Sequence, residues 1–283
     1  MRVLVAGGRG QLGQALIATA PRSLTITAPS KADFDITNAD QVTSLVAFEK
    51  PDLLINAAAW TAVDKAETEE DPAFLANATA VENLAKAATL VGARFVHVST
   101  DYVFDGHACK PYRPDSLPAP ASAYGRTKLA GELAAATHHS APLIVRTAWV
   151  YSAGGNNFVK TMLRLMAERD EVRVVADQVG TPTHASSLAR AIWALQFHSG
   201  TFHWTDAGVT SWYDFAQAIQ DEAIALGLLD RTVPIIPIAT EDYPTPAQRP
   251  AWSVLDKSAS WAVTGPGRHW RHALIDCLKE IQK

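Results

Sequence analysis

Short apolar runs rich in β-branched residues alternate with longer stretches of helical periodicity along the first half of the chain. This alternation is typical of a parallel sheet that is covered by helices on both faces. We expect strands at residues 2–6, 24–28, 53–57, 94–99 and 143–147. We expect helices between them at residues 11–20, 39–49, 72–91 and 121–138.

The pattern becomes less regular after Tyr151. It still predicts helices at residues 158–169, 186–196, 212–226 and 270–281, and strands at 172–176 and 233–238. Four prolines between residues 105 and 121 predict an irregular loop that leads into the helix after it. We therefore expect two domains, residues 1–151 and mainly residues 152–283, with some of the later segments returning to the first domain.

The spacing Gly7-x-x-Gly10-x-x-Gly13 directly follows the first expected strand and opens the first expected helix. Glycines here let the backbone approach a phosphate, and the helix N-terminus favours the negative charge of a pyrophosphate. An ordinary tight turn is the alternative, which the strand-to-helix position disfavours. The fold class expected is α/β, a Rossmann-type doubly wound parallel sheet with a smaller C-terminal α/β substrate-binding domain.

Composition narrows the choice of ligands. The 283 residues are 48% hydrophobic and carry a formal net charge of −4 without a basic stripe, so we expect neither nucleic acid nor a membrane surface as a partner. No segment reaches the length of a membrane span, and no leader is evident, so we expect a cytoplasmic protein. Cys109 and Cys277 have no metal-ligand spacing, which agrees with a reducing compartment.

Tyr124 and Lys128 stand four residues apart, on one face of an expected helix. An ammonium beside a phenol would lower the pKa of the phenol toward neutrality, and the phenol can then deliver a proton to a carbonyl. Thr100 ends the strand that precedes this helix, where its hydroxyl can hydrogen-bond the same carbonyl. These three residues predict a proton-transfer unit in a hydride-transfer enzyme.

Other positions allow two interpretations. The small residues Ala57, Ala58 and Ala59 after Asn56 suit either close approach of a cofactor or simple packing. Asp35 suits either adenine contact or, like Thr37, a helix N-cap. Trp149 follows the last strand of the sheet and would face the cleft, although buried tryptophans more often belong to a core. The nine histidines show no metal-binding spacing, so we expect no catalytic metal.

Taken together, these motifs resemble the extended short-chain dehydrogenase/reductases and, within them, the dTDP-4-dehydrorhamnose reductase family. The resemblance covers nearly the whole chain. Beyond the glycine turn it rests on residues 56–67, 99–106, 124–132, 146–151, 156–158, 177–183 and 243–250.

The resemblance implies NAD(P)H-dependent reduction of the C4 ketone of dTDP-4-dehydro-L-rhamnose to dTDP-L-rhamnose, an activated sugar for cell-surface polysaccharides. Tyr124 would donate the proton, with Lys128 as its partner and Thr100 polarising the ketone. Thr100, Asp101, Tyr124 and Trp149 would contact the sugar nucleotide. The cofactor would be lined by Gly7, Gly10, Gln11, Leu12, Gly13, Asp35, Ile36, Ala57, Ala58, Ala59, Tyr124 and Lys128.

Some relatives in this family dimerise around Mg²⁺ through three glutamates, and the matching positions here are Gln14, Ser186 and Arg271. Mg²⁺ prefers anionic oxygen ligands, so we expect a monomer or a dimer that no metal bridges. Residues 25–28 supply neither the carboxylate that selects NAD nor the arginine that selects NADP. We expect NADPH, with NADH possible. The alternatives are a reductase of another dTDP-4-keto-deoxysugar, or a non-catalytic regulatory subunit that binds a dinucleotide.

Overall fold

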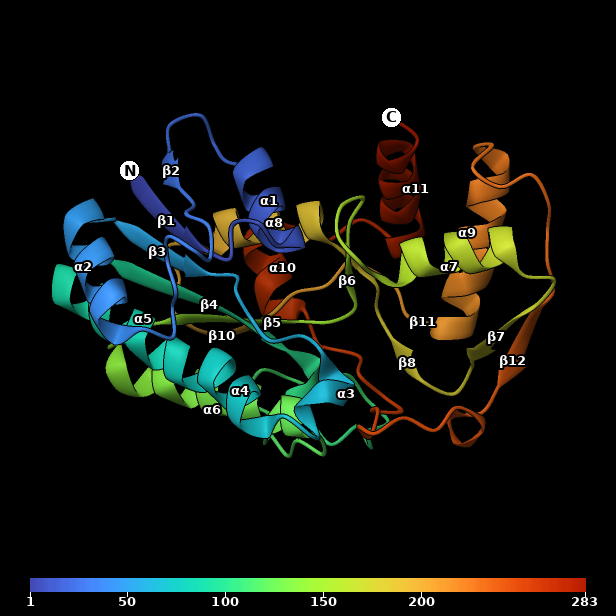
Figure 1. The fold of residues 1–283 in the computed structure, drawn as a ribbon, viewed down its shortest axis with the longest axis horizontal. Coiled ribbons are helices and arrows are strands. Elements are labelled where there is room, and N and C mark those ends of the chain that lie inside the picture. The colour runs from blue at the N-terminus through green and yellow to red at the C-terminus, as the bar shows by residue number, and fades with distance from the viewer.

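The computed structural model describes residues 1–283 and is built on a six-stranded sheet in which all neighbouring strands are parallel (Figure 1). The strand order, β10-β5-β4-β3-β1-β2, confirms the predicted doubly wound parallel sheet. Its register sets the strand ends side by side, with Asn56 opposite both Ala6 and His97. The strands are β1 (Arg2–Ala6), β2 (Thr25–Thr27), β3 (Leu53–Asn56), β4 (Arg94–Thr100), β5 (Leu143–Thr147) and β10 (Gly200–His203).

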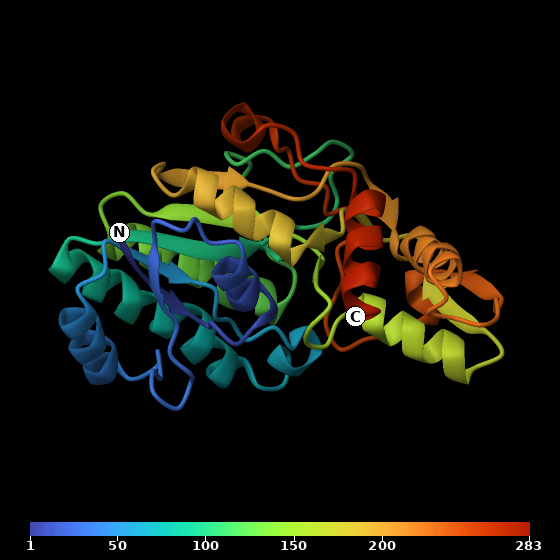
Figure 2. The ribbon, with the colours of Figure 1, turned by 90° about the horizontal axis from the view of Figure 1, so that it is seen from above.

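Helices cover both faces of this sheet (Figure 2). Successive residues of β3 point to opposite faces, so Leu53 and Ile55 join one apolar core while Leu54 joins the other. Burial on both faces explains why the strands read as continuous apolar runs. One face carries α1 (Gln11–Ala18) and α8 (Ala185–Leu195), and the other carries α2 (Ala39–Glu49), α5 (Ala80–Val91) and α6 (Ala123–His138).

A second lobe lies beside the sheet, to its right in Figure 1. It has its own apolar core, in which Met162, Phe215 and Leu274 are buried. Two short strand pairs, β6 (Val150–Tyr151) with β9 (Thr183–His184) and β8 (Val179–Gly180) with β11 (Thr210–Ser211), lie where the chain passes between the lobes. The lobe contains α7 (Phe158–Glu168), β7 (Val172–Val175), α9 (Trp212–Ala225), β12 (Ile235–Ile238) and α11 (Trp270–Ile281).

The structure adds detail that the sequence pattern did not predict. Strand β10 was not expected, because it has only four residues and begins at Gly200 with φ +89°. Helix α8 is one of the later segments that return to the first lobe, because it packs against α1 on the sheet. The helix expected over residues 72–91 is divided into α4 (Glu70–Phe74), a π-helical turn (Leu75–Thr79) and α5. None of the helices combines the length and the hydropathy needed to cross a bilayer.

A buried ion pair joins α6 to β5. The guanidinium of Arg146 donates to the carboxylate of Glu132 through Nε at 2.9 Å and Nη2 at 2.7 Å, and both side chains are only 5% exposed. The remaining nitrogen of Arg146, Nη1, donates to the Pro114 carbonyl at 3.3 Å. Because two parallel bonds hold the planar guanidinium, the pair fixes α6 against the sheet one turn beyond Lys128.

We predict that Glu132→Gln lowers the free energy of unfolding by about 3–5 kcal/mol, because it leaves a buried guanidinium without a counter-charge. The matched control is Glu168→Gln, in the pair with Arg164 whose side chains are 57% and 59% exposed. That change should cost less than about 1 kcal/mol. Urea unfolding of both variants measures this, and equal losses would contradict the prediction.

Candidate functional site

The glycine turn between β1 and α1 packs its backbone directly against other backbone. Gly7 has φ +82°, and a Cβ atom there would lie 2.6 Å from the amide nitrogen of Ala58. A Cβ atom at Gly13 would collide with the Gly7 carbonyl oxygen. The Gly10 N–H closes the turn by donating to that carbonyl at 2.9 Å. Side chains at Gly7 and Gly13 are therefore excluded sterically, which explains the sequence spacing.

Helix α1 presents an uncapped N-terminus to the cavity described below. Its N-cap residue is Gly10, no side chain accepts from the first-turn amides, and the first turn holds no acidic residue. Free amides and a positive dipole end suit a pyrophosphate. The cradle formed by the glycine turn therefore fits a dinucleotide, whose phosphates would meet Gly10, Gln11 and Leu12.

Residues after β2 and β3 complete this side of the site. The Asn56 side chain accepts from the Ala58 amide at 3.0 Å, which fixes the small residues Ala57 to Ala59 in the turn. The Asp35 carboxylate accepts from the Thr37 amide at 3.0 Å and hydroxyl at 2.8 Å, and these bonds hold the pKa of Asp35 below its usual value. The N-cap of α2 is Asn38, so the N-cap interpretation of Asp35 and Thr37 is wrong.

Two cations that the sequence analysis did not select, Arg9 and Lys31, also line the cavity. A Cβ atom at Gly8, next to Arg9, would lie 2.6 Å from Cβ of Ala28, so Arg9 stands at the carboxyl end of β2. Lys31 follows the same strand and favours the charged form of Asp35. The position of Arg9 inside the glycine motif was the one sequence feature that could have indicated its role. The close approach of its neighbour Gly8 to Ala28, just after β2, could not be predicted from the sequence.

The proton-transfer residues meet where β4 ends and α6 begins. Ser122 caps α6, accepting from the Gly125 amide at 3.1 Å. A Cβ atom at Gly125 would collide with the carbonyl oxygen of Tyr102, so only glycine lets this first turn approach the end of β4. The ring of Tyr124 packs edge-on against Tyr102, with centroids 5.4 Å apart. Thr100, Asp101, Tyr124 and Lys128 consequently line one cavity, as the sequence predicted.

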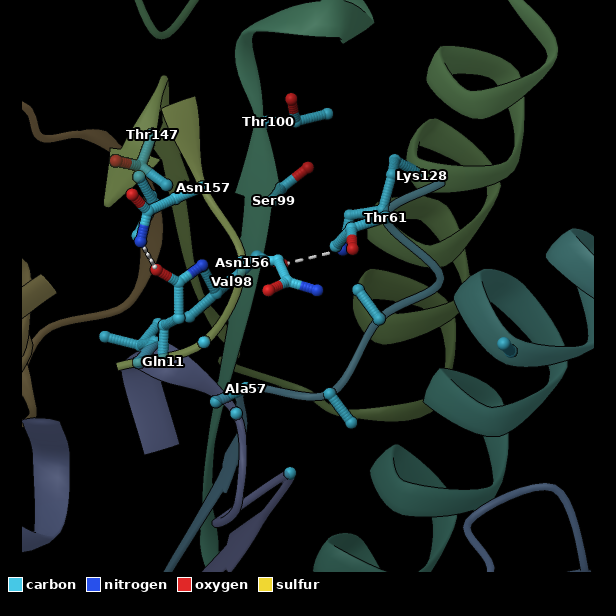
Figure 3. A pocket seen from close by; sticks show the side chains of 18 of the residues that line it. Gln11, Ala57, Thr61, Val98, Ser99, Thr100, Lys128, Thr147, Asn156 and Asn157 are labelled. Atoms are coloured by element: carbon cyan, nitrogen blue, oxygen red, sulfur yellow. Dashed lines mark hydrogen bonds between the residues drawn. The ribbon is translucent and has the colours of Figure 1, made fainter. Parts of the chain in front are cut away.

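The charges in this cluster differ from the expectation. Burial raises the pKa of the Tyr124 phenol, and the nearby Thr100 hydroxyl only partly opposes this. Lys128 Nζ donates to the Val98 carbonyl at 2.7 Å (Figure 3), and burial lowers its pKa to about 8. The expected lowering of the phenol pKa by the ammonium is therefore wrong for the protein alone, because burial dominates both groups.

Thr100 and Asp101 form a buried pair beside the phenol. The Thr100 hydroxyl donates to the Asp101 carboxylate at 2.9 Å and accepts from the Tyr102 amide at 3.2 Å. Burial raises the pKa of Asp101 to about 6, and its Oδ2 atom has no partner. The structure thus holds a hydroxyl and a carboxyl group in fixed positions next to Tyr124.

Trp149 occupies an unusual backbone conformation, with φ +49°. Its ring stacks on Trp212 from the second lobe, with centroids 3.5 Å apart and planes at 9°. A Cβ atom at Gly180 would lie 2.7 Å from the Trp149 ring, so that glycine makes room for it. Non-glycine residues with positive φ are enriched at ligand sites, where packing compensates the strain. Trp212, which the sequence analysis did not select, is thus part of the site.

All these groups surround a cavity of about 830 Å³ between the sheet edge and the second lobe. A second cavity of about 1130 Å³ adjoins it, since both are lined by Tyr102, Phe158 and Trp212. Gly13 lies beneath the turn rather than on the cavity wall. The predicted residues that line the first cavity are Gly7, Gly10, Gln11, Leu12, Asp35, Ile36, Ala57, Ala58, Ala59, Thr100, Asp101, Tyr124, Lys128 and Trp149.

A glycine cradle for phosphates and a Tyr/Lys/Thr cluster at the carboxyl edge of a parallel sheet define a Rossmann-type oxidoreductase. The family model described as RmlD substrate binding domain matches residues 1–283, and the chain belongs to that family.

Individual relatives agree with this assignment. The chain is 41% identical to a dTDP-4-dehydrorhamnose reductase from Burkholderia thailandensis, over 99% of each chain. It is 40% identical to the spore coat polysaccharide biosynthesis protein SpsK of Bacillus subtilis, over 99% of this chain and 97% of that protein. A solved dTDP-4-dehydrorhamnose reductase from Bacillus anthracis, in complex with NADP, superposes with a TM-score of 0.93 at 38% identity over 99% of each chain.

The lowered pKa of Lys128 gives a prediction about stability and pH. Between about 8 and the usual value of 10.5, the unfolded chain binds a proton at this lysine that the folded chain has lost. Stability should therefore rise with pH across this window, by up to about 3 kcal/mol from this residue. Lys128→Met should lack the rise. The control Lys65→Met, at a lysine whose side chain is 67% exposed, should follow the wild type. Urea midpoints at pH 7, 8, 9 and 10 measure the effect, and parallel curves for all three proteins would contradict it.

Proposed function

We propose that this protein is an NADPH-dependent dTDP-4-dehydrorhamnose reductase, which reduces the C4 ketone of dTDP-4-dehydro-L-rhamnose to dTDP-L-rhamnose. The observation that carries the proposal is the convergence of Thr100, Tyr124 and Lys128 with the glycine cradle on one cavity. The names of full-length relatives at about 40% identity supply the substrate. We place the reaction in the cytoplasm, where this activated sugar would be made.

The cofactor assignment rests on the fit of the cradle and on charge. The uncapped α1 N-terminus favours the pyrophosphate. Arg9 and Lys31 at the carboxyl end of β2 stand where a Rossmann-type fold receives the adenosine ribose, so they favour a 2′-phosphate there. The NADP bound to the Bacillus anthracis relative agrees with this choice.

Bound NADPH supplies the hydride, and three residues of the chain supply the proton, a hydrogen bond and a positive charge. Tyr124 donates a proton to the oxygen that was the ketone, and its raised pKa keeps the phenol protonated until that oxygen becomes basic. The Thr100 hydroxyl, which donates to Asp101 in the free protein, turns its one hydrogen toward the same oxygen when the sugar is bound. Lys128 holds the nicotinamide ribose and supplies positive charge as the phenolate forms.

The sugar nucleotide is held by residues opposite the cradle. Asp101 lies beside Thr100 and presents a carboxyl group to sugar hydroxyls. Trp149, fixed by its stack on Trp212, offers a rigid aromatic surface at the point where the second lobe closes the cavity. These contacts, together with those of Thr100 and Tyr124, orient C4 toward the proton donor.

We also propose that neither activity nor assembly uses a bridging divalent metal, so the protein is a monomer or a dimer formed through another surface. Gln14 Nε2 donates to the Arg9 carbonyl at 3.1 Å. Arg271 is paired within its own chain, with Glu222 at 2.8 Å and Asp221 at 3.1 Å. A guanidinium at this position opposes a cation, so EDTA should change neither turnover nor sedimentation.

The direct test is oxidation of NADPH by the purified protein with dTDP-4-dehydro-L-rhamnose, in the presence of EDTA, followed by NMR of the product. Ketone-dependent oxidation and dTDP-L-rhamnose as product would support the proposal. Turnover of a different dTDP-4-ketosugar in place of this one would change the assigned substrate. Dinucleotide binding without turnover of any such sugar would favour the regulatory alternative.

We predict that Tyr124→Phe lowers kcat by roughly 10²-fold or more, because a positioned acid contributes on that scale. The dissociation constants of NADPH and the sugar nucleotide should stay nearly unchanged, since the ring and its packing on Tyr102 remain. Steady-state kinetics and calorimetry measure both. A variant that kept its kcat would remove Tyr124 from the mechanism.

We predict that Arg9→Ala and Lys31→Ala each weaken NADPH binding by about tenfold, the scale of one charge-assisted contact to phosphate. NADH binding should change little, because NADH lacks that phosphate. Arg22→Ala, at an exposed arginine outside the cavity, is the control. Equal weakening of both dinucleotides would show that these cations do not recognise the 2′ position.

A further inference from the structure

Gln11 connects the glycine cradle to the second lobe. It is the first residue of α1, and its side-chain Oε1 accepts a hydrogen bond from Asn157 Nδ2 at 2.9 Å. Ser152 Oγ lies 3.0 Å from the same oxygen and shares its one hydrogen between Oε1 and the Gly154 carbonyl at 2.8 Å. Figure 3 shows the bond that joins the side chains of Gln11 and Asn157. Both donors lie on the loop that runs from β6 into α7, more than 140 residues further along the chain.

This loop is shaped around Gln11. Gly155 has φ +70°, and a Cβ atom there would lie 2.9 Å from Cγ of Gln11. Asn157 also donates to the Ser152 carbonyl at 2.8 Å, and its Oδ1 caps α7 by accepting from the Lys160 amide at 3.2 Å. The side-chain amide of Asn157 therefore closes the loop, caps the N-terminus of α7 and hydrogen-bonds to Gln11. The position of Gln11 consequently sets the position of the first turn of α7.

The first turn of α7 matters because it carries Phe158, which lines both cavities and packs on Trp212 with centroids 4.6 Å apart. Trp212 in turn carries the stacked Trp149 ring. A shift of α7 would therefore move the aromatic wall that faces the sugar side of the cavity. Packed aromatic contacts of this kind transmit displacement because interiors are close-packed.

The other end of Gln11 faces the dinucleotide cradle. Its backbone amide belongs to the uncapped first turn of α1, and its side chain lines the cavity. Nε2 donates to no acceptor in the protein, while Oε1 accepts from Asn157 and lies within hydrogen-bond distance of Ser152 on the loop before α7. Because the side-chain amide group is planar, a phosphate oxygen that accepts from Nε2 would also fix the direction of Oε1.

We propose that Gln11 is a positioning residue that couples dinucleotide binding to the placement of the second lobe, so that the bound dinucleotide completes the sugar-nucleotide half of the cavity. The inference rests on the proposed function for the identity of the two ligands. Coupling of this kind is reciprocal, so each ligand tightens the other by the same factor.

The experiment compares binding of dTDP-L-rhamnose by calorimetry with and without saturating NADPH, a pair that cannot react. We expect NADPH to tighten binding of the sugar nucleotide about fivefold or more in the wild type. Gln11→Ala should bring this factor close to one. Asn157→Asp should do the same, because it keeps the oxygen that caps α7 and loses the Nδ2 donor.

Gln14→Ala is the matched control. Gln14 stands on the same helix, three residues beyond Gln11, and its Nε2 donates only to the Arg9 carbonyl. Its variant should retain the wild-type factor. A full factor in Gln11→Ala, or a factor of one in the wild type, would overturn the inference.

Hydrogen exchange separates failure of this inference from failure of the proposed function. NADPH should protect the amides of α7 in the wild type and in Gln14→Ala, but not in Gln11→Ala. If the wild type bound NADPH and not dTDP-L-rhamnose, the substrate assignment would fail, while protection of α7 would still uphold the role of Gln11. Absence of that protection in the wild type would overturn the role of Gln11 as well.

Discussion

The site depends on close contact between backbone segments at the carboxyl edge of the sheet. Gly7 meets Ala58, Gly13 meets the Gly7 carbonyl, and Gly125 meets the carbonyl of Tyr102, at separations that no Cβ atom would allow. These contacts bring the N-termini of α1 and α6 to the same edge. The positive end of one helix and the phenol of the other thereby face a common cavity. Replacement of any of these glycines would displace a helix, not merely a loop.

The sequence predicted the parts of the molecule that local pattern determines. The strands of the sheet, except β10, and the Tyr124/Lys128 face follow from periodicity, and Thr100 follows from its place at a strand end. Strand β10, the cation Lys31 and the bonds of Gln11 were not predicted, because each depends on a partner distant in sequence. Trp212 is similar, since nothing near it in the chain indicates the stack with Trp149.

The largest error concerned electrostatics. Spacing on a helix places an ammonium one turn from a phenol, but it does not say how much water each group retains. Here both groups are buried, so desolvation raises the pKa of Tyr124 and lowers that of Lys128, whose ammonium is engaged by the Val98 carbonyl. The cluster is costly to bury, and the Glu132 carboxylate one turn away partly offsets that cost by favouring the charged form of Lys128.

Strand β10 has a consequence for the order in which the chain folds during synthesis. It pairs with β5 at the edge of the sheet, yet it comes from residues 200–203, after α7 and α8 have been made. A ribosome-bound chain that has emerged only to residue 151 would therefore expose the free edge of β5 and the apolar face that α8 covers. The two lobes are thus interdependent in biogenesis. The sheet of the first lobe cannot be completed until α7 and β7 of the second lobe have also been synthesised.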